Sequence, residues 1–326
     1  MTKRLFLILL ILFPLTILEG NTATEDFEIK HADSLEADEE QISIKGNILI
    51  KYNNATIEAL DGKIKTDQKG KPDKAQFYNR AKIRLKDRKI EADKITVSIP
   101  EKIIYAEGNS TSELKDKNNN LIIIISDYQE LHWDGENANA KGNIRTSYQN
   151  TKITSDEAKI IYKNKKPVQA IFTGNTKQAH MEEKNHETFA YEFVFDINSN
   201  DIYAKREVKS TIWPYKAKSK KEQNPISLNT DELFIDHKTG EVTAKGKTNR
   251  VKITYEDTKG ESNEGLLLRD EQNKKPEKIV FKGNANVSQA DKELSSEEVI
   301  FNFNNKKLTS NTITNVRPKT LIFKKG

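Results

Sequence analysis

The sequence predicts an all-β protein in which about 25 short antiparallel strands stack into an elongated, V-shaped roll. Two observations predict it. Apolar and polar residues alternate along most of the chain, and no long stripe with a helical period occurs. A unit of strand, tight turn and strand also recurs about every 30 to 40 residues, often with a Gly-Asn pair.

The composition favours a long, thin architecture over a compact enzyme. Apolar residues make up 35% of the 326 residues and charged residues 32%, which is too polar for one large core. The 54 Lys and Arg residues exceed the 49 Asp and Glu residues by only five, and this mild charge does not favour a nucleic-acid partner. The chain has no cysteine, so disulfides and thiolate metal sites are excluded.

The N-terminus resembles an export signal. Lys3 and Arg4 precede LFLILLILFPLTIL at residues 5–18, and small and polar residues follow. These 14 positions are shorter than the roughly 20 that a membrane-spanning helix needs. We expect cleavage between about Gly20 and Thr24, which makes residues 1–23 a signal peptide and the mature protein periplasmic. Retention as an inner-membrane anchor is the alternative.

A strand is expected at residues 41–52, QISIKGNILIKY. Its apolar residues share one parity, so an extended strand places them on one face. They are Ile42, Ile44, Ile48, Ile50 and Tyr52.

A Gly-Asn pair interrupts this strand and recurs after later apolar alternations. Glycine inside a strand marks a bulge or bend, and Asn tolerates a left-handed backbone, so each pair predicts a strand bend. The alternative is a simple turn between two strands. The predicted bend glycines are Gly46, Gly108, Gly142, Gly174 and Gly283, with Gly246 before Lys247 in the equivalent place.

An acidic residue recurs upstream of most of these pairs. Because it occupies one position of a structural repeat, we expect it to make capping or turn hydrogen bonds rather than to act as a paired catalytic carboxylate. The residues are Asp33, Asp93, Asp156, Asp231 and Glu297.

The chain divides into two sets of repeats. Residues 27–212 form the first set, within which the segment 189–208 alternates Phe189, Tyr191, Phe193, Phe195 and Ile197 before its turn. Residues 213–225 carry two prolines and a basic run, which predicts an insertion or linker. The same pattern resumes over residues 226–323, so both sets are expected to share one architecture.

No catalytic, metal or cofactor site is predicted. His180 and His186 flank Glu182 and Glu183, but the spacing does not match an HExxH motif, and a solvated loop is the favoured interpretation. Nucleophile and phosphate-loop motifs are absent from the sequence.

The apolar strand faces predict a continuous apolar channel if the stack folds into a roll. Two outcomes stay open. The faces can pack as a filled core, as in an extracellular scaffold or adhesin, or hold acyl chains. The candidate groove residues are Ile42, Ile44, Ile48, Ile50, Tyr52, Phe77, Ile83, Ile144, Phe172, Phe193, Phe195, Val251, Ile253, Ile279 and Phe281.

Four segments resemble the OstA-like family of lipopolysaccharide-transport proteins, which includes LptA, LptC and the periplasmic N-terminal domain of LptD. They are HADSLEADEEQISIKGNILI at 31–50, KIEADKITVSIPEKIIYAEGN at 89–109, NANAKGNIRTSY at 137–148 and KIVFKGNANV at 278–287. The motif is degenerate, and it extends over most of residues 27–316.

The resemblance implies a periplasmic β-jellyroll that carries the acyl chains of lipopolysaccharide and joins end to end with partner jellyrolls in outer-membrane assembly. It implies no enzyme activity. A homo-oligomer through the terminal strands is a further expectation. The chain looks longer than a typical bridge protein and has no room for the barrel of LptD, so an extended bridge and an anchored LptC-like component are both open.

Overall fold

A computed structural model describes residues 27–38, 40–133, 135–213, 224–272, 274–311 and 319–322. The predicted export signal at 1–23 and residues 214–223 of the predicted linker lie outside the described residues. Among the described residues there is no helix, and so none that could cross a membrane.

The described chain forms 24 strands of one antiparallel sheet, which confirms the all-β prediction. The first twelve are β1 (Phe27–His31), β2 (Ser34–Ala37), β3 (Gln41–Tyr52), β4 (Ala55–Thr66), β5 (Pro72–Leu85), β6 (Arg88–Ser98), β7 (Ile103–Lys115), β8 (Leu121–His132), β9 (Asn137–Tyr148), β10 (Thr151–Lys163), β11 (Lys166–Thr173) and β12 (Ala179–Glu183). The others are β13 (His186–Ala190), β14 (Glu192–Asp196), β15 (Ile202–Ile212), β16 (Ile226–Ile235), β17 (Val242–Lys245), β18 (Val251–Tyr255), β19 (Thr258–Ser262), β20 (Glu264–Arg269), β21 (Pro276–Gln289), β22 (Lys292–Asn302), β23 (Lys307–Asn311) and β24 (Lys319–Ile322).

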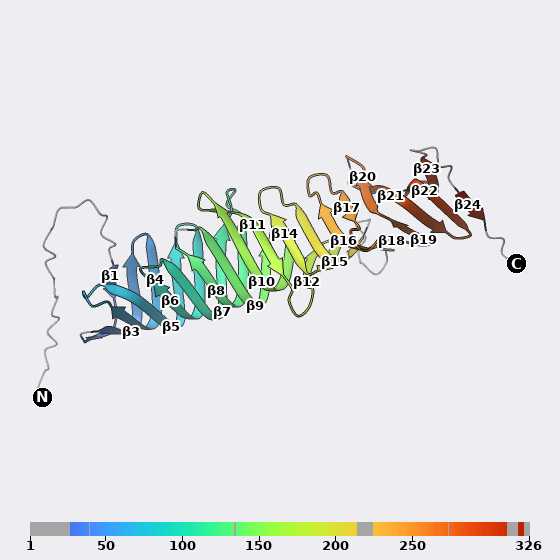
Figure 1. Cartoon of the computed structure of the whole chain (residues 1–326). Helices are drawn as coiled ribbons and strands as arrows, with labels where there is room; N and C mark the ends of the chain where they lie inside the picture. Colours follow the sequence, from blue (N-terminus) through green and yellow to red (C-terminus); the bar gives the residue numbers. More distant parts are fainter. Residues whose placement is uncertain are drawn as a thin grey trace, which may run out of the picture.

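The strands follow one another as a meander, and Figure 1 shows them stacked into a long twisted roll. Long strands pair with the strands before and after them, as β4 does with β3 and β5. Elsewhere two short strands replace one long strand, as β11 and β12 do beside β10. Strand β15 pairs with β16 up to Ile212 and Ile226, so the stack continues on both sides of residues 214–223.

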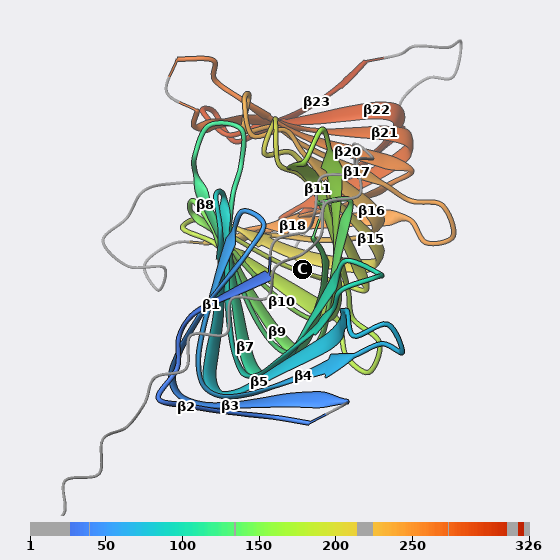
Figure 2. The ribbon, with the colours of Figure 1, turned by 90° about the vertical axis from the view of Figure 1, so that its left-hand side faces the viewer.

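The long strands bend near their middle, and the view along the roll in Figure 2 shows the resulting V. In β3, Gly46 and Asn47 have φ of 73° and 46°. Lys45 pairs with Asp61 and Ile48 with Ala59, so two residues of β3 face one residue of β4. This β-bulge turns the strand from one arm of the V into the other. We call the line of bends along the roll the crease.

The other predicted bend glycines lie along the same crease. Gly108, Gly142 and Gly283 lie inside β7, β9 and β21 with positive φ, each at a register shift. Gly174 and Gly246 lie in the breaks after β11 and β17 and have no positive φ. The crease also uses two pairs without glycine, Asn79-Arg80 in β5 and Arg206-Glu207 in β15, all four at positive φ.

The recurring acids hold the crease by hydrogen bonds, as predicted. Asn47 and Asn109 donate from Nδ2 to Asp33 at 3.1 Å and to Asp93 at 2.8 Å. Asp156 accepts from the backbone N–H groups of residues 175 and 176 at 2.7 and 2.9 Å, and Asp231 accepts from those of residues 247 to 249. Glu297 accepts a longer bond of 3.4 Å from the N–H of Asn284. These bonds hold the pKa of Asp231 down to about 2, chiefly through Asn249.

The bend changes which residues face inward on the strands that carry the acid. In β10 the buried residues are Thr151, Ile153 and Ser155 before the bend, and Ala158 and Ile160 after it. The inward parity therefore switches on β10 at the crease, where the single residue Asp156 faces both Gly142 and Asn143 of β9.

This switch corrects the predicted alternation at 189–197. Thr188, Ala190, Phe193 and Phe195 are buried, whereas Phe189 is 39% exposed on the outer face. The segment is divided between β13 and β14 at Tyr191, so Phe189 does not share a face with Phe193.

Replacing Gly108 tests the crease. A Cβ there would lie 2.6 Å from Asp93 Oδ2, and φ is +74°. Gly70 has the same φ in an open turn, with nothing within 4 Å of its Cβ position. We expect G70A to lower the free energy of unfolding by about 1 kcal/mol through backbone strain alone, and G108A by about 2–3 kcal/mol because Asp93 must also move. Urea denaturation measures both, and equal losses would contradict a special role for the crease.

Candidate functional site

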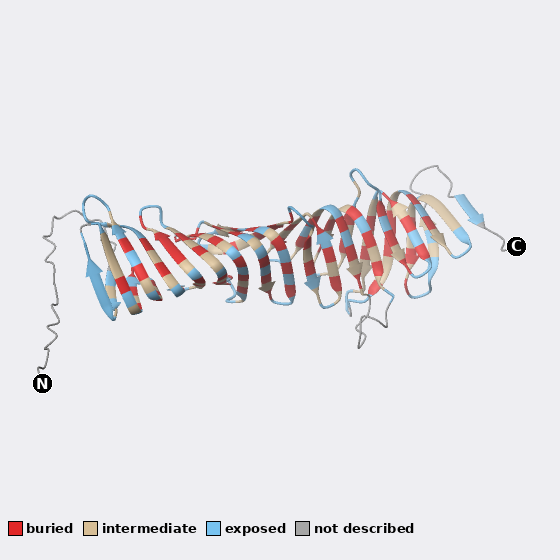
Figure 3. Ribbon diagram, turned by 90° about the horizontal axis from the view of Figure 1, so that it is seen from below, coloured by how far each residue is buried: buried red, intermediate tan, exposed pale blue. Residues whose placement is uncertain are grey.

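The interior of the V is the candidate functional site. Alternate residues of each strand are buried along most of the roll, as the banded colouring in Figure 3 shows. The fifteen candidate groove residues all face this interior: fourteen are buried, and Ile42 is partly buried against them. They belong to one apolar cluster that extends from Ile44 to Phe303.

The interior is tightly packed. The phenyl rings of Phe77, Phe172, Phe193 and Phe281 are fully buried. Between β8, β10 and β11, a cavity of about 20 Å³ lies among apolar side chains that include Ile122 and Ile160. That volume holds roughly one water molecule, so the two arms are in contact there.

Opposite the crease, the turns form the two edges of the V. The first edge carries the turns after β3, β5, β7 and β9, and later those after β12, β18 and β21. The second edge carries the turns after β4, β6, β8 and β10, and later those after β14, β16, β20 and β22. We call the line where the two edges meet the seam.

Side chains close the seam in its N-terminal part. Tyr52 on the first edge meets Trp133 on the second, edge to face, with ring centroids 5.1 Å apart. Arg88 reaches across to donate to the carbonyl of His132 at 3.2 Å and lies over the ring of Tyr162, 5.4 Å from its centroid. Its neighbour Asp87 forms an ion pair of 3.0 Å with Lys166.

Similar contacts close the central and C-terminal parts. Glu183 and His237 form an ion pair of 3.0 Å across the seam. Lys306 and Glu256 form another at 2.6 Å, and the rings of Tyr255 and Phe303 pack edge to face at 4.9 Å.

No backbone-to-backbone hydrogen bond between described residues crosses the seam. Among the described residues, the backbone hydrogen bonds outside the strands join turns of one edge, as Trp133 N does with Lys102 O at 2.7 Å, or lie at the crease. The arms are therefore joined covalently and by the sheet at the crease. Over the described part of the seam they are joined by side chains alone.

Sequence reasoning assigned His180 and His186 to a solvated loop, and this is wrong. Both lie on strands. His180 contacts Glu187 at 2.8 Å and stacks on Phe189 with centroids 4.4 Å apart. His186 is buried and its Nε2 lies 2.6 Å from Ser210 Oγ and 2.9 Å from Thr188 Oγ1. Over the described part of the chain, no group of three or more His, Asp and Glu side chains is arranged to hold a metal ion.

The charges near the centre of the seam are set by burial and by each other. Burial lowers the pKa of His186 to about 4, so its ring is neutral at pH 7. The hydrogen bond to Glu183 raises the pKa of His237. Burial alone would raise the pKa of Glu183, but His237 and Thr151 outweigh it and lower that pKa. The Glu183–His237 pair is therefore ionic between the lowered pKa of Glu183 and the raised pKa of His237.

Comparisons with known proteins find a likeness to solved structures. No family model and no curated protein matches the chain. A solved structure described as LptH, the LptA homologous periplasmic component of the lipopolysaccharide transport device from Pseudomonas aeruginosa, is 16% identical over 41% of this chain and 94% of that one, with a TM-score of 0.35. These values do not assign the chain to a family.

The buried His186 predicts that the free energy of unfolding decreases at acidic pH, and we call this decrease the acid limb. Its folded pKa of about 4 lies below the ordinary 6.5, so its contribution is complete above pH 6.5 and is lost as the pH falls towards 4. The loss amounts to about 3 kcal/mol at most. The raised pKa of His237 acts in the opposite direction, because its contribution is present below pH 6.5 and is lost as the pH rises through the folded pKa.

We expect H186Q to flatten the decrease in urea midpoint between pH 6.5 and 4, since Gln keeps a hydrogen-bonding group near Ser210 without titrating. H180Q, at the histidine that stacks on the outward-facing Phe189, serves as the control and should keep that decrease. An unchanged acid limb in H186Q would rule out His186 as its source.

Proposed function

We propose that this protein binds lipopolysaccharide in the periplasm, shields the acyl chains inside the V, and bridges the inner and outer membranes. One observation carries the proposal: among the described residues, a continuous apolar interior is closed along one side by side-chain contacts alone. Acyl chains are apolar and need such an interior, and a seam without backbone bonds gives them a way in from the side.

Opening needs no break in the sheet. If the arms rotate about the crease, the bends change their angle while the ladders of hydrogen bonds on each arm stay paired. When the arms separate, their apolar surfaces no longer cover each other, but the acyl chains cover them instead. Each Å² of apolar surface kept out of water in this way contributes about 25 cal/mol. An acyl chain can therefore replace arm-to-arm contact at little net cost.

Lipopolysaccharide as the lipid, and the periplasm as the compartment, rest on the OstA-like sequence motifs and on the predicted export signal. The proposed role needs no catalysis and no cofactor.

The ends of the roll support end-to-end assembly. Strand β2 pairs with β3, and β24 with β22, and each has an open side among the described residues. Leu35 on β2 and Leu321 on β24 are 51% and 57% exposed. Partner jellyrolls, or a second copy of this chain, would pair with these edges.

The tight interior favours a second candidate, a structural solenoid with a filled core that acts as an extracellular scaffold or adhesin. Fully buried phenylalanines and a cavity of about 20 Å³ are what such a core needs. The two candidates differ in whether the arms separate in the presence of lipid.

Photocrosslinking separates these candidates. With a photoreactive residue at Ile44, Ile50 or Phe281, all on the inner face, we expect crosslinks to lipopolysaccharide. The same residue at the outward Lys45 or Lys51 is the control and should give few crosslinks. Crosslinks confined to the outward positions would refute an interior site.

Locking the seam tests the route of entry. The chain has no cysteine, so E183C/H237C carries only the introduced thiols, one on each edge. Bridging them with a short bis-maleimide should abolish interior crosslinking, because the arms cannot part. The control E192C/K205C joins two residues that pair on one arm and should leave crosslinking intact. If the seam-locked protein still takes up lipid, entry occurs from the ends of the roll.

A further inference from the structure

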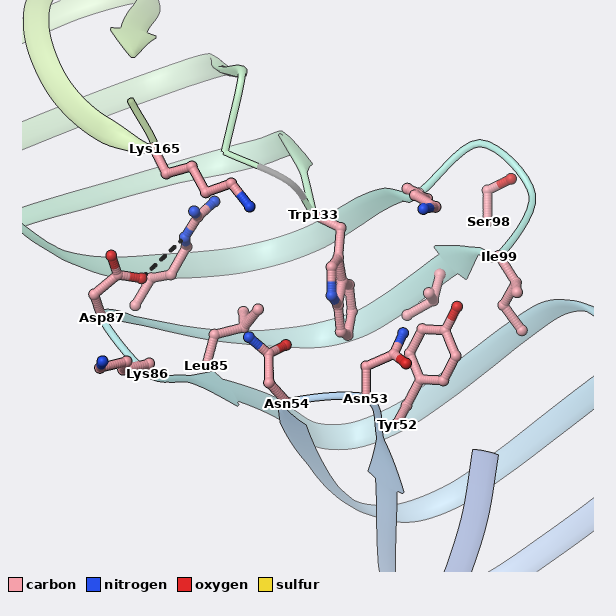
Figure 4. Close-up of a pocket in the computed structure, with 13 residues that line it drawn as sticks. Tyr52, Asn53, Asn54, Leu85, Lys86, Asp87, Ser98, Ile99, Trp133 and Lys165 are labelled. Carbon is pink, nitrogen blue, oxygen red and sulfur yellow. Dashed lines mark ion pairs between the residues drawn. The ribbon is translucent and has the colours of Figure 1, made fainter. Parts of the chain in front are cut away.

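A pocket of about 340 Å³ opens on the N-terminal part of the seam (Figure 4). Both edges line it. Asn53, Asn54 and Lys86 come from the first edge, and Lys102 and Lys165 from the second. The pocket therefore lies where the two arms would separate.

The polar lining is predominantly basic. Lys86, Arg88, Lys102 and Lys165 line the pocket, against the single acid Asp87. Burial by itself would raise the pKa of Asp87, but its bonds with Lys166 and Arg88 lower that pKa, so the carboxylate is already neutralised by two cations. Positive charge remains at the mouth for an anionic ligand.

One of these cations is held in place. The Arg88 side chain is 8% exposed and is fixed by the carbonyl of His132 and the ring of Tyr162. Figure 4 shows Lys165 extending from the second edge towards the ring of Trp133. Arginine and lysine side chains bind phosphate oxygens through charge-assisted hydrogen bonds, so a fixed guanidinium beside exposed lysines suits a phosphate ligand.

The floor of the pocket is the apolar interior itself. Tyr52, Val97, Ile99 and Trp133 line the pocket and also belong to the buried apolar cluster. Tyr52 and Trp133, which contact each other across the seam, therefore border both the basic pocket and the core. A ligand with a charged head and an apolar tail would find both environments within one site.

We propose that this pocket binds the phosphate-bearing head of an amphipathic lipid, whose acyl chain passes the Tyr52–Trp133 contact into the interior. The inference deepens the proposed lipid-binding function and rests on it. It assigns the head group to one place along the roll, whereas the interior alone would accept acyl chains anywhere. The asparagines at residues 53 and 54 add neutral hydrogen-bonding groups beside the cations.

Trp133 provides the readout. The chain has two tryptophans, so in a W213F background Trp133 is the sole tryptophan, and its emission can be excited selectively over that of the tyrosines. Dioctanoyl phosphatidic acid, titrated below its micellar concentration, should give a saturable change in Trp133 emission. Dioctanoylglycerol tests the tail without the phosphate, and inorganic phosphate tests the phosphate without the tail. We expect dioctanoylglycerol to bind more weakly than phosphatidic acid, and inorganic phosphate to cause no change in emission.

The variant K86Q/K165Q removes one exposed cation from each edge and should weaken phosphatidic acid binding roughly fivefold, with a smaller salt dependence. The matched variant K152Q/K209Q removes two exposed lysines from the outer faces of β10 and β15 and should bind as the parent does. The urea midpoints of both variants report whether each remains folded.

Three outcomes would overturn the inference. They are parent-like affinity in K86Q/K165Q, an equal loss in K152Q/K209Q, and the same emission change with inorganic phosphate alone. If any one of them occurs while a photoreactive residue at position 44 still crosslinks to lipid, the head-group site is wrong and the proposed function stands. If neither phosphatidic acid nor dioctanoylglycerol binds and Ile44 gives no crosslink, the proposed function fails as well.

Discussion

The bend in the middle of each long strand is the constraint on which the rest of the structure depends. A flat sheet of these strands would leave one apolar face in water. The bulges fold that face onto itself, and an acid from the neighbouring strand bonds to each of many bends, as Asp127 does to Asn143 at 2.7 Å. Because adjacent strands share these bonds, a bend in one strand fixes the position of the bend in the next.

The outer face fixes the same register by charge. One row of residues beside the crease alternates in sign from strand to strand over the C-terminal half of the roll. Its members, paired in order, are Glu192, Lys205, Glu232, Lys245, Glu264, Lys282 and Glu298. Each exposed pair contributes little alone. A strand shifted by one residue, however, would lose its oppositely charged partners in this row and would turn its apolar face to solvent. Charge and burial therefore select the same pairing.

The sequence predicted the fold class well, because alternation and the Gly-Asn pairs are local signals. The crease at Asn79-Arg80 and at Arg206-Glu207 was missed because it lacks glycine. The switch of apolar parity, from Ile90 and Ala92 to Ile95 and Val97 in β6, was the signal that could have found the bends without glycine. The seam could not be predicted, since Glu183 and His237 are 54 residues apart and no periodic pattern connects them.

A packed interior does not decide between a scaffold and a lipid carrier. Apolar faces held apart in water would lose about 25 cal/mol for every Å² exposed, so the arms of an empty carrier must close as well. The two functions differ in how the arms are joined. A scaffold gains from backbone bonds across both sides of its core, as a closed barrel has. This roll has the sheet at the crease and, among the described residues, only side chains at the seam. Such a boundary can exchange protein contacts for lipid contacts without unfolding either arm.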